Sequence, residues 1–282
     1  IRRRRSRPCR IILVRHGESC GNVDKTLYSR TPDSVIQLTE RGWAQGKLAG
    51  ERIRELIGDE SARFFYSPYV RTRQTLLAML GAFHLRPVEL TSEPRLREQD
   101  FGNFQDPEDM EKVYVERQKF GRFYYRFPNG EACTDVYDRV CDFWSTLYRF
   151  MEVPQHDKRH TDNFILVTHG LLMRIFCMCY FRWTVVEFDQ VWNPSNCEIW
   201  VLKKTEAGRY RLEGHWEDDC FKPIKFGQNK SQPVHDHMKE PSPAREIVPG
   251  ATNAMEDPIL AHLQCVPGPP DGFDAQPTPK KK

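Results

Sequence analysis

The sequence predicts an α/β fold in which helices cover both faces of a mostly parallel sheet, which is a three-layer α/β/α sandwich. Short apolar runs rich in β-branched residues alternate with segments whose apolar residues repeat at helical spacing. This alternation is typical of parallel sheets. The composition, 39% hydrophobic and 29% charged in 282 residues, is that of a globular protein.

Six segments are expected to form the sheet. Each is short, apolar or alternating in polarity, and most are bounded by charged or turn-forming residues. In chain order they are Ile11–Val14, Phe64–Tyr66, Val88–Leu90, Phe164–Val167, Glu198–Leu202 and Tyr210–His215.

Two segments between these strands show a single apolar stripe at the spacing of an amphipathic helix. The stripes indicate helices that pack one face on a core. The first contains Ala49, Ile53, Leu56 and Ile57, and the second contains Val136, Val140, Phe143 and Leu147.

The ends of the chain differ from its middle. Residues 1–9 are a basic segment, expected to be a flexible arm, and residues 10–220 carry the alternating pattern of one folded domain. Eleven of the twenty prolines fall in residues 221–282, which contain few aromatic residues. Such a segment buries too little apolar area to offset the entropy of ordering, so we expect a disordered tail.

The composition also limits the partners and the compartment. No apolar run approaches the roughly 18 residues that span a bilayer, so no membrane partner is expected. The nine cysteines are scattered without a CxxC pair, which favours reduced thiols in a cytoplasmic setting and gives no metal site. The basic arm leaves a nuclear location open, but it lacks the interleaved aromatic residues that bind nucleic acid bases.

The first chemical cluster follows the first expected strand. Arg15, His16 and Gly17 come at its carboxyl end, where ligands bind in open α/β sheets. Gly17 allows the backbone to approach a ligand closely, and Asn22 adds a neutral amide donor. A second His-Gly step, His169-Gly170, follows the strand Phe164–Val167 in the same way.

Two further clusters follow other strands. Arg71 is expected in the first turn of a helix after Ser67-Pro68, where a guanidinium and a helix N-terminus together favour an anion. Glu98 and Asp100 lie in the stretch after Val88–Leu90, and either carboxyl is a candidate acid.

The four clusters together resemble the histidine phosphatase superfamily, also called phosphoglycerate-mutase-like. The resemblance rests on R-H-G, S-x-x-x-R-x-x-x-T, L-x-E-x-x-x-G and the late H-G, in this order over residues 10–216. Residues 97–105 (REQDFGNFQ) and 127–131 (FPNGE) look most similar to plant phosphoglycerate-mutase-like proteins and fungal broad-range acid phosphatases.

The resemblance implies a sheet with one antiparallel strand and a phosphomonoester hydrolase that needs neither metal nor cofactor. His16 is then the nucleophile that forms a phosphohistidine, and Glu98 is the proton donor. The phosphate-binding set is Arg15, Asn22, Arg71, His169 and Gly170. A protonated His169 is expected to add positive charge to this set.

Two other functions remain open. A phosphoglycerate mutase of the same superfamily is disfavoured, because Thr26–Arg30 and residues 97–105 depart from the stretches that mutases carry there. A non-catalytic protein that binds a phosphorylated ligand is the other alternative.

The substrate is expected to be a small phosphate monoester, and the sequence carries no signal for the oligomeric state. Specificity would come from a cap-like region between about residues 101 and 129. Ser19, Asn103 and Gln105 are candidate substrate contacts.

Overall fold

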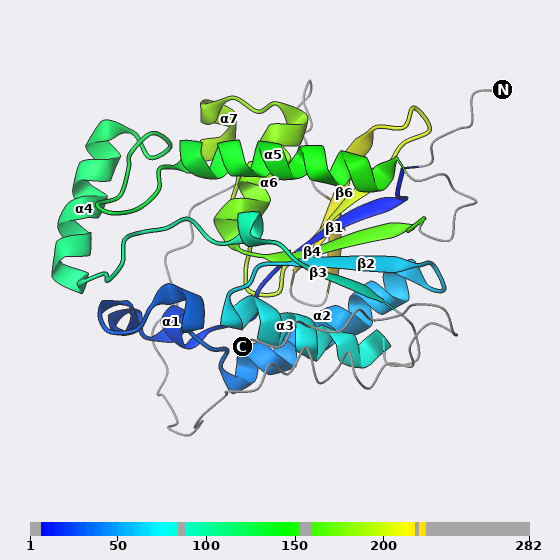
Figure 1. The fold of residues 1–282 in the computed structure, drawn as a ribbon, viewed down its shortest axis with the longest axis horizontal. Helices are drawn as coiled ribbons and strands as arrows, with labels where there is room; N and C mark the ends of the chain where they lie inside the picture. Colours follow the sequence, from blue (N-terminus) through cyan, green and yellow to red (C-terminus); the bar gives the residue numbers. More distant parts are fainter. Residues whose placement is uncertain (1–6, 84–87, 153–159, 218–219, 224–282) are drawn as a thin grey trace, which may run out of the picture.

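The computed structural model describes residues 7–83, 88–152, 160–217 and 220–223, and these contain a seven-stranded sheet. The strands lie in the order β3-β2-β4-β1-β5-β6-β7 (Figure 1). They are β1 (Arg10–Arg15), β2 (Ala62–Tyr66), β3 (Glu89–Ser92), β4 (Asn163–Thr168), β5 (Ile199–Lys204), β6 (Tyr210–Glu217) and β7 (Cys220–Pro223).

The strand directions confirm a mostly parallel sheet. Strands β3, β2, β4 and β1 pair in parallel, and β5 runs antiparallel to β1, as the resemblance implies. Strand β6 is antiparallel to β5, and β7 is antiparallel to β6, so β7 adds a second reversed strand at the edge.

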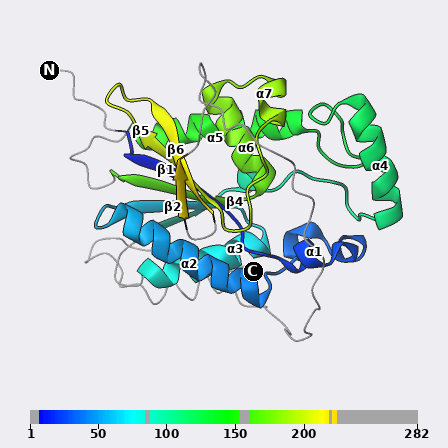
Figure 2. The ribbon, with the colours of Figure 1, turned by 180° about the vertical axis from the view of Figure 1, so that it is seen from behind.

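Helices cover both faces of this sheet, which confirms the three-layer sandwich (Figures 1 and 2). On one face lie α5 (Cys133–Met151), α6 (Gly170–Phe181) and α7 (Val185–Asp189), and on the other lie α2 (Glu40–Ile57) and α3 (Val70–Leu80).

Side chains of β1 alternate between the two layers because successive residues of a strand point to opposite faces. Ile11 and Leu13 belong to the core beside α5 and α6. Ile12 and Val14 belong to the core beside α2 and α3. The central strand is therefore buried on both faces, which is why it is an unbroken apolar run.

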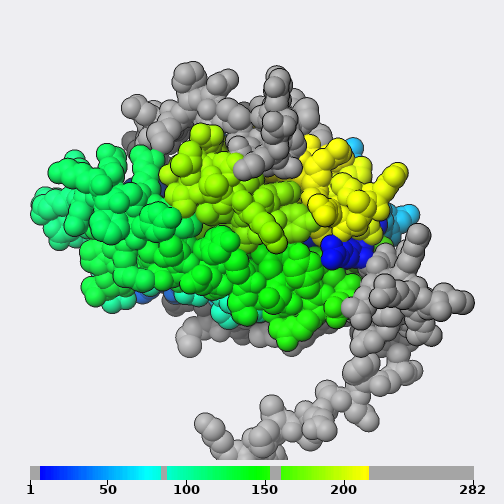
Figure 3. All heavy atoms as spheres, turned by 90° about the horizontal axis from the view of Figure 1, so that it is seen from above, coloured from blue at the N-terminus to red at the C-terminus, as the bar shows by residue number. Residues whose placement is uncertain are grey.

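One of the remaining helices lies in the expected cap. The others, except η3, lie near the edge of the sheet where the candidate site is expected. Residues 101–130 protrude at one end of the molecule and carry α4 (Figures 1 and 3). These helices are α1 (Cys20–Val23), α4 (Pro107–Phe120) and the short 3-10 helices η1 (Lys25–Ser29), η2 (Asp33–Val35), η3 (Gly81–Phe83) and η4 (Pro94–Leu96).

Both predicted helical stripes are confirmed as core faces, in α2 and α5. Two strands begin one residue later than predicted, β3 at Glu89 and β5 at Ile199. Glu198 precedes β5 because its backbone N–H closes a turn onto the Ser195 carbonyl, and its carboxylate accepts the Ser195 N–H at 2.6 Å.

The expected arm and tail differ from the structure at their inner ends. Residues 7–9 are anchored, because Lys204 donates to the Arg7 carbonyl at 2.6 Å and Tyr210 donates to the Pro8 carbonyl at 2.8 Å. Three residues of the expected tail belong to β7. Residues 1–6 and 224–282 lie outside the described residues.

Candidate active site

Two histidines meet at the carboxyl edge of the sheet. His16 follows β1 and His169 follows β4, and these neighbouring parallel strands end in register, with Arg15 paired to Thr168. The two imidazole centroids lie 5.2 Å apart at an angle of 64°. Both side chains are buried. The structure therefore brings the two His-Gly steps of the sequence into one site.

The contacts of His16 determine which ring nitrogen carries its proton. Nδ1–H donates to the Gly17 carbonyl at 2.7 Å, and the Arg71 Nε–H donates to Nε2 at 3.3 Å. Burial, followed by the charges of Arg71 and Arg15, holds the pKa of His16 well below 6.5. His16 is therefore a neutral imidazole whose Nε2 lone pair faces the guanidinium of Arg71.

Gly17 lets α2 approach the end of β1. A Cβ atom on Gly17 would lie 2.4 Å from the carbonyl oxygen of Gly42. The Gly17 N–H donates to Thr75 Oγ1 at 3.0 Å. A larger residue here would displace the backbone that carries His16.

Arg71 lies in the first turn of α3, as predicted, and its side chain is 3% exposed. Its outer nitrogens bind the Asp33 carboxylate, with Nη1 to Oδ1 at 2.7 Å and Nη2 to Oδ2 at 3.1 Å. Asp33 comes from η2 and carries no sequence signal that would have predicted it.

His169 makes a different set of contacts. Its Nε2 lies 2.9 Å from Ser67 Oγ, which accepts the Tyr69 N–H at 3.4 Å. The Ser67 hydroxyl is thus the partner of Nε2, and Nδ1 is the ring nitrogen of His169 that has no hydrogen-bond partner among the described residues. Burial, followed by the charge of Arg71, holds the pKa of His169 well below 6.5, so the expectation of a protonated His169 is wrong for this environment.

Glu98 lies beside His169. Its Oε2 is 4.0 Å from His169 Nδ1. Burial raises the pKa of the Glu98 carboxyl, and the charge of Arg71 opposes this effect. A carboxyl with a raised pKa keeps its proton to higher pH, which suits a proton donor.

The loop that carries Glu98 is held by α5. The Arg139 guanidinium donates to the carbonyls of residues 95, 97 and 98 at 2.5, 2.9 and 3.0 Å. Gln99 donates to the Glu131 carbonyl at 2.7 Å, and the Glu131 carboxylate accepts from Arg139 at 3.1 Å. The stretches at 97–105 and 127–131, which carried the resemblance, therefore contact each other.

Arg15 precedes His16 in the chain, and Gly170 follows His169. Arg15 Nη1 donates to the Pro194 carbonyl at 2.5 Å. Gly170 is the first residue of α6, and a Cβ there would lie 2.5 Å from Asn193 Oδ1. The backbone N–H groups at this helix start are free of helical partners, which favours an anion.

The side chain of Asn22 is oriented by hydrogen bonds to its oxygen. Its Oδ1 accepts from Ser19 Oγ at 3.0 Å and from Asn196 Nδ2 at 3.1 Å. The same Asn196 amide donates to the His16 carbonyl at 3.1 Å. The amide nitrogen of Asn22 is therefore the part available to donate to a ligand. Asn196 was not identified from the sequence.

Unpartnered buried donors are concentrated in this site. Within the described residues, the buried side-chain nitrogens without a hydrogen-bond partner are Arg15 Nε, His169 Nδ1 and Arg174 Nε. Two of the three belong to the predicted phosphate-binding set. Because buried polar nitrogens are nearly always paired, these two nitrogens indicate a site for a ligand that would bind them.

The three candidate substrate residues are not brought together. Ser19 is fully buried and its hydroxyl donates to Asn22. Asn103 is exposed, and Gln105 donates its backbone N–H to the Tyr28 carbonyl at 2.9 Å. Their contact with substrate stays a prediction.

Two tyrosines at the site were missed by sequence reasoning. The Tyr69 ring lies 5.2 Å from that of His169, and the Arg71 guanidinium lies 5.0 Å from the Tyr69 ring centroid. Burial raises the pKa of Tyr28 to about 12, although the positive charges of Arg71 and Arg15 lower it. Tyr69 stands within the S-x-x-x-R stretch, but nothing in the sequence marks Tyr28.

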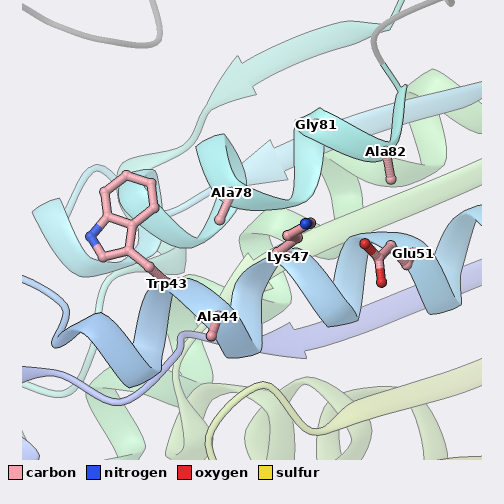
Figure 4. A pocket seen from close by; sticks show the side chains of 7 residues that line it. All are labelled: Trp43, Ala44, Lys47, Glu51, Ala78, Gly81 and Ala82. Carbon is pink, nitrogen blue, oxygen red and sulfur yellow. The ribbon is translucent and has the colours of Figure 1, made fainter.

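A hollow of about 430 Å³ elsewhere contains none of these residues. It lies between the outer sides of α2 and α3, and is lined by Trp43, Ala44, Lys47, Glu51, Ala78, Gly81 and Ala82 (Figure 4). Among the described residues, no three His, Cys, Asp or Glu side chains are grouped to hold a metal ion. No described helix is long and apolar enough to cross a membrane.

The paired imidazoles and converging donors suit a phosphate group, and sequence comparison identifies the class. The model of the histidine phosphatase superfamily (branch 1) matches residues 11–217, and the chain belongs to this superfamily. It is 42% identical to phosphoglycerate mutase-like protein AT74H of Arabidopsis thaliana, over 79% of this chain and 83% of that one. It is 31% identical to the broad-range acid phosphatase DET1 of Saccharomyces cerevisiae, over 73% and 89%.

Solved structures share the fold. A mycobacterial glucosyl-3-phosphoglycerate phosphatase in complex with VO3 superposes with a TM-score of 0.59, at 18% identity, over 74% of this chain and 98% of that one. The likeness shows that the two proteins share the fold.

Proposed function

We propose that the protein is a metal-independent phosphomonoester hydrolase that acts through a phosphohistidine on His16. The observation that carries this proposal is the neutral His16, whose Nε2 lone pair faces Arg71 beside two unpartnered donors, Arg15 Nε and His169 Nδ1. A phosphate monoester carries nearly two negative charges near neutral pH, so these donors would lower the repulsion met by the nucleophile.

In the first step, the His16 Nε2 lone pair forms a bond to phosphorus and the bond from phosphorus to the ester oxygen breaks. The proton of the Glu98 carboxyl goes to the leaving oxygen. Arg15, Arg71, Asn22, the Gly170 N–H and the neutral Nδ1–H of His169 hold the transferring oxygens. Positioned acid catalysis contributes about 10²–10⁴-fold.

In the second step, Glu98 is a carboxylate and takes a proton from water. The water oxygen bonds to phosphorus, the bond from phosphorus to Nε2 breaks, and the lone pair returns to His16. Glu98 regains its proton, and inorganic phosphate leaves. Two smaller barriers thereby replace one large barrier. Arg15 and Arg71 supply the positive charge that a metal ion supplies in other phosphatases.

The pKa shifts imply a pH profile with two limbs. Attack requires neutral His16, so activity is lost as pH falls through a pKa that lies well below 6.5. Leaving-group protonation requires protonated Glu98, so activity is lost as pH rises through a pKa that burial has raised above 4.5. The optimum therefore lies between these two limbs.

The substrate class is a small phosphate monoester, in line with the similarity to DET1, which is named a broad-range acid phosphatase. Among the similar proteins, AT74H is named phosphoglycerate mutase-like. A mutase would return the phosphoryl group of His16 to a second hydroxyl, whereas a hydrolase gives it to water. We also propose a cytoplasmic or nuclear location, since the seven cysteines from Cys9 to Cys197 are free.

A phosphomonoester panel across about pH 4 to 8 tests the proposal, because activity should change with pH as His16 and Glu98 titrate. Inorganic phosphate should appear in step with loss of ester. Isomerised phosphoglycerate, formed from 3-phosphoglycerate with 2,3-bisphosphoglycerate and without phosphate release, would establish the mutase instead. Binding of phosphate esters without turnover or labelling of His16 would establish the non-catalytic alternative.

A further inference from the structure

Arg71 is held at one edge by a residue that has no part in the reaction steps above. Asp33 lies in η2, and its carboxylate and backbone carbonyl both accept from the guanidinium. The Arg71 side chain is 3% exposed and that of Asp33 is 18% exposed. A charge-assisted bidentate pair with little solvent access is a strong and directional interaction.

The donors of the guanidinium can be counted. Arg71 has five N–H groups in a planar fork. Nη1 donates to the Asp33 carbonyl at 2.6 Å and to Oδ1 at 2.7 Å, and Nη2 donates once to Oδ2 at 3.1 Å. The remaining two are the Nε–H, which lies 3.3 Å from His16 Nε2, and the second N–H of Nη2. These two point from the other edge of the fork.

We propose that Asp33 is a positioning residue, which grips one edge of the Arg71 guanidinium so that its other edge presents a two-donor fork at His16 Nε2. This inference rests on the proposed function, because the fork would then hold the phosphoryl group that Nε2 attacks. Two parallel N–H groups match two oxygens of a phosphate. Arg71 binds Asp33 and the phosphoryl group at the same time and need not exchange one for the other.

The alternative is that Asp33 competes with phosphate for Arg71. Competition would require the carboxylate and the phosphate to use the same donors. The Nε–H that faces the nucleophile is not among the donors used by Asp33. The two arrangements predict opposite effects when Asp33 is replaced, because a positioning residue supports turnover and a competitor restrains it.

The test uses the full chain with Asp33→Asn and Asp33→Glu. Asp24→Asn is the matched control, because Asp24 lies nearby in the chain, caps η1 through the Thr26 N–H at 2.9 Å and lies near Arg30, not Arg71. For each variant, kcat, KM, the inhibition constant of inorganic phosphate and Tm are measured. A misplacement of about 1 Å in a reacting group costs on the order of 100-fold in rate.

We expect Asp33→Asn to lower kcat by about ten- to a hundredfold. The inhibition constant of phosphate should change by less than about threefold, because loss of a negative charge offsets looser alignment of Arg71. Asp33→Glu, which keeps the carboxylate on a longer side chain, should recover part of kcat. Asp24→Asn should keep the wild-type kcat.

Higher kcat/KM with tighter phosphate binding in Asp33→Asn would show competition and overturn the inference. Unchanged kinetics, or equal losses of kcat in Asp33→Asn and Asp24→Asn, would also overturn it. Failure of the proposed function is a separate outcome, since the wild-type protein would then neither hydrolyse the esters nor label His16.

Discussion

The ends of β1 and β4 share one sequence pattern and have two chemical environments. Each strand is apolar and ends in a His-Gly step. His16 has Nδ1 bound to a backbone carbonyl and Nε2 facing Arg71, whereas His169 has Nε2 bound to Ser67 and Nδ1 near Glu98. The comparison shows that neighbouring groups, and not the His-Gly step itself, decide which ring nitrogen of each imidazole is left to face a ligand.

One segment makes the distinction for both histidines. Ser67, Arg71 and Thr75 are spaced four residues apart, with Ser67 just before α3 and the other two within it. Ser67 contacts His169, Arg71 contacts His16, and Thr75 accepts the backbone N–H of Gly17. The three side chains of the S-x-x-x-R-x-x-x-T pattern therefore contact the ends of both strands.

The largest effect is expected from removing His16, which should abolish labelling where removal of His169 does not. His16→Ala removes the Nε2 lone pair that accepts from the Arg71 Nε–H and is the proposed nucleophile, so kcat should fall by more than about 10⁴-fold. No alkali-stable, acid-labile phosphoenzyme should be trapped after an alkaline quench, whereas His169→Ala should still label. Normal turnover in purified His16→Ala, with an unchanged Tm, would contradict a phosphohistidine mechanism.

Glu98→Gln tests the carboxyl beside His169 and should have the next largest effect. The amide cannot donate a proton to the leaving group or take one from water, so kcat should fall by about 10²–10⁴-fold. Phosphoenzyme should accumulate when the ester has a good leaving group, because the hydrolytic step is then the slower one. The matched control is Glu93→Gln, whose carboxylate pairs with Arg95 through Oε2 at 2.6 Å.

The pH profile gives a second reading of this variant. In the proposed mechanism, the alkaline limb of the wild type follows loss of the Glu98 proton, and burial raises the pKa of that carboxyl. Gln has no such proton, so the alkaline limb of kcat/KM should disappear in Glu98→Gln. An alkaline limb that stays in place would assign it to another group.

The sequence predicts the layers and the strand ends well because both depend on local, repeated signals. Ile11–Val14 is apolar on both faces, and the stripes of α2 and α5 have a clear period. The position of His16 and His169 follows from the same signals, since parallel strands bring their carboxyl ends to one edge.

The partners that tune the site are harder to predict because they act across turns that have no period. Asp33 and Asn196 stand in irregular segments and reach the site only through the path of the chain. The protonation of His169 was mispredicted for a related reason. Its burial and the nearby charge of Arg71 depend on packing that no single stretch of sequence records.

His169→Asn sharpens the comparison at the second strand end. Asn keeps an N–H donor of similar reach but loses the ring, so part of the contact with the transferring oxygens is retained. Loss of one such donor costs about 10²–10³-fold in kcat, and Asn should fall at or below the lower end of this range. Steady-state kinetics with labelling of His16 measure it, and a loss as large as that of His16→Ala would make the two histidines equivalent.

The smallest effects are expected from removing the two hydroxyls that contact the strand ends. Ser67→Ala removes the donor to His169 Nε2, so the imidazole can place its proton on either nitrogen, and kcat should fall by about tenfold or less. Thr75→Val keeps the shape of the side chain but leaves the buried Gly17 N–H without its acceptor, which costs about 1–3 kcal/mol of stability. Ser67→Ala should therefore act mainly on kcat, and Thr75→Val mainly on Tm. Equal losses of kcat and Tm in the two variants would mean that neither hydroxyl distinguishes the histidines, and that the α3 surface only supports the fold.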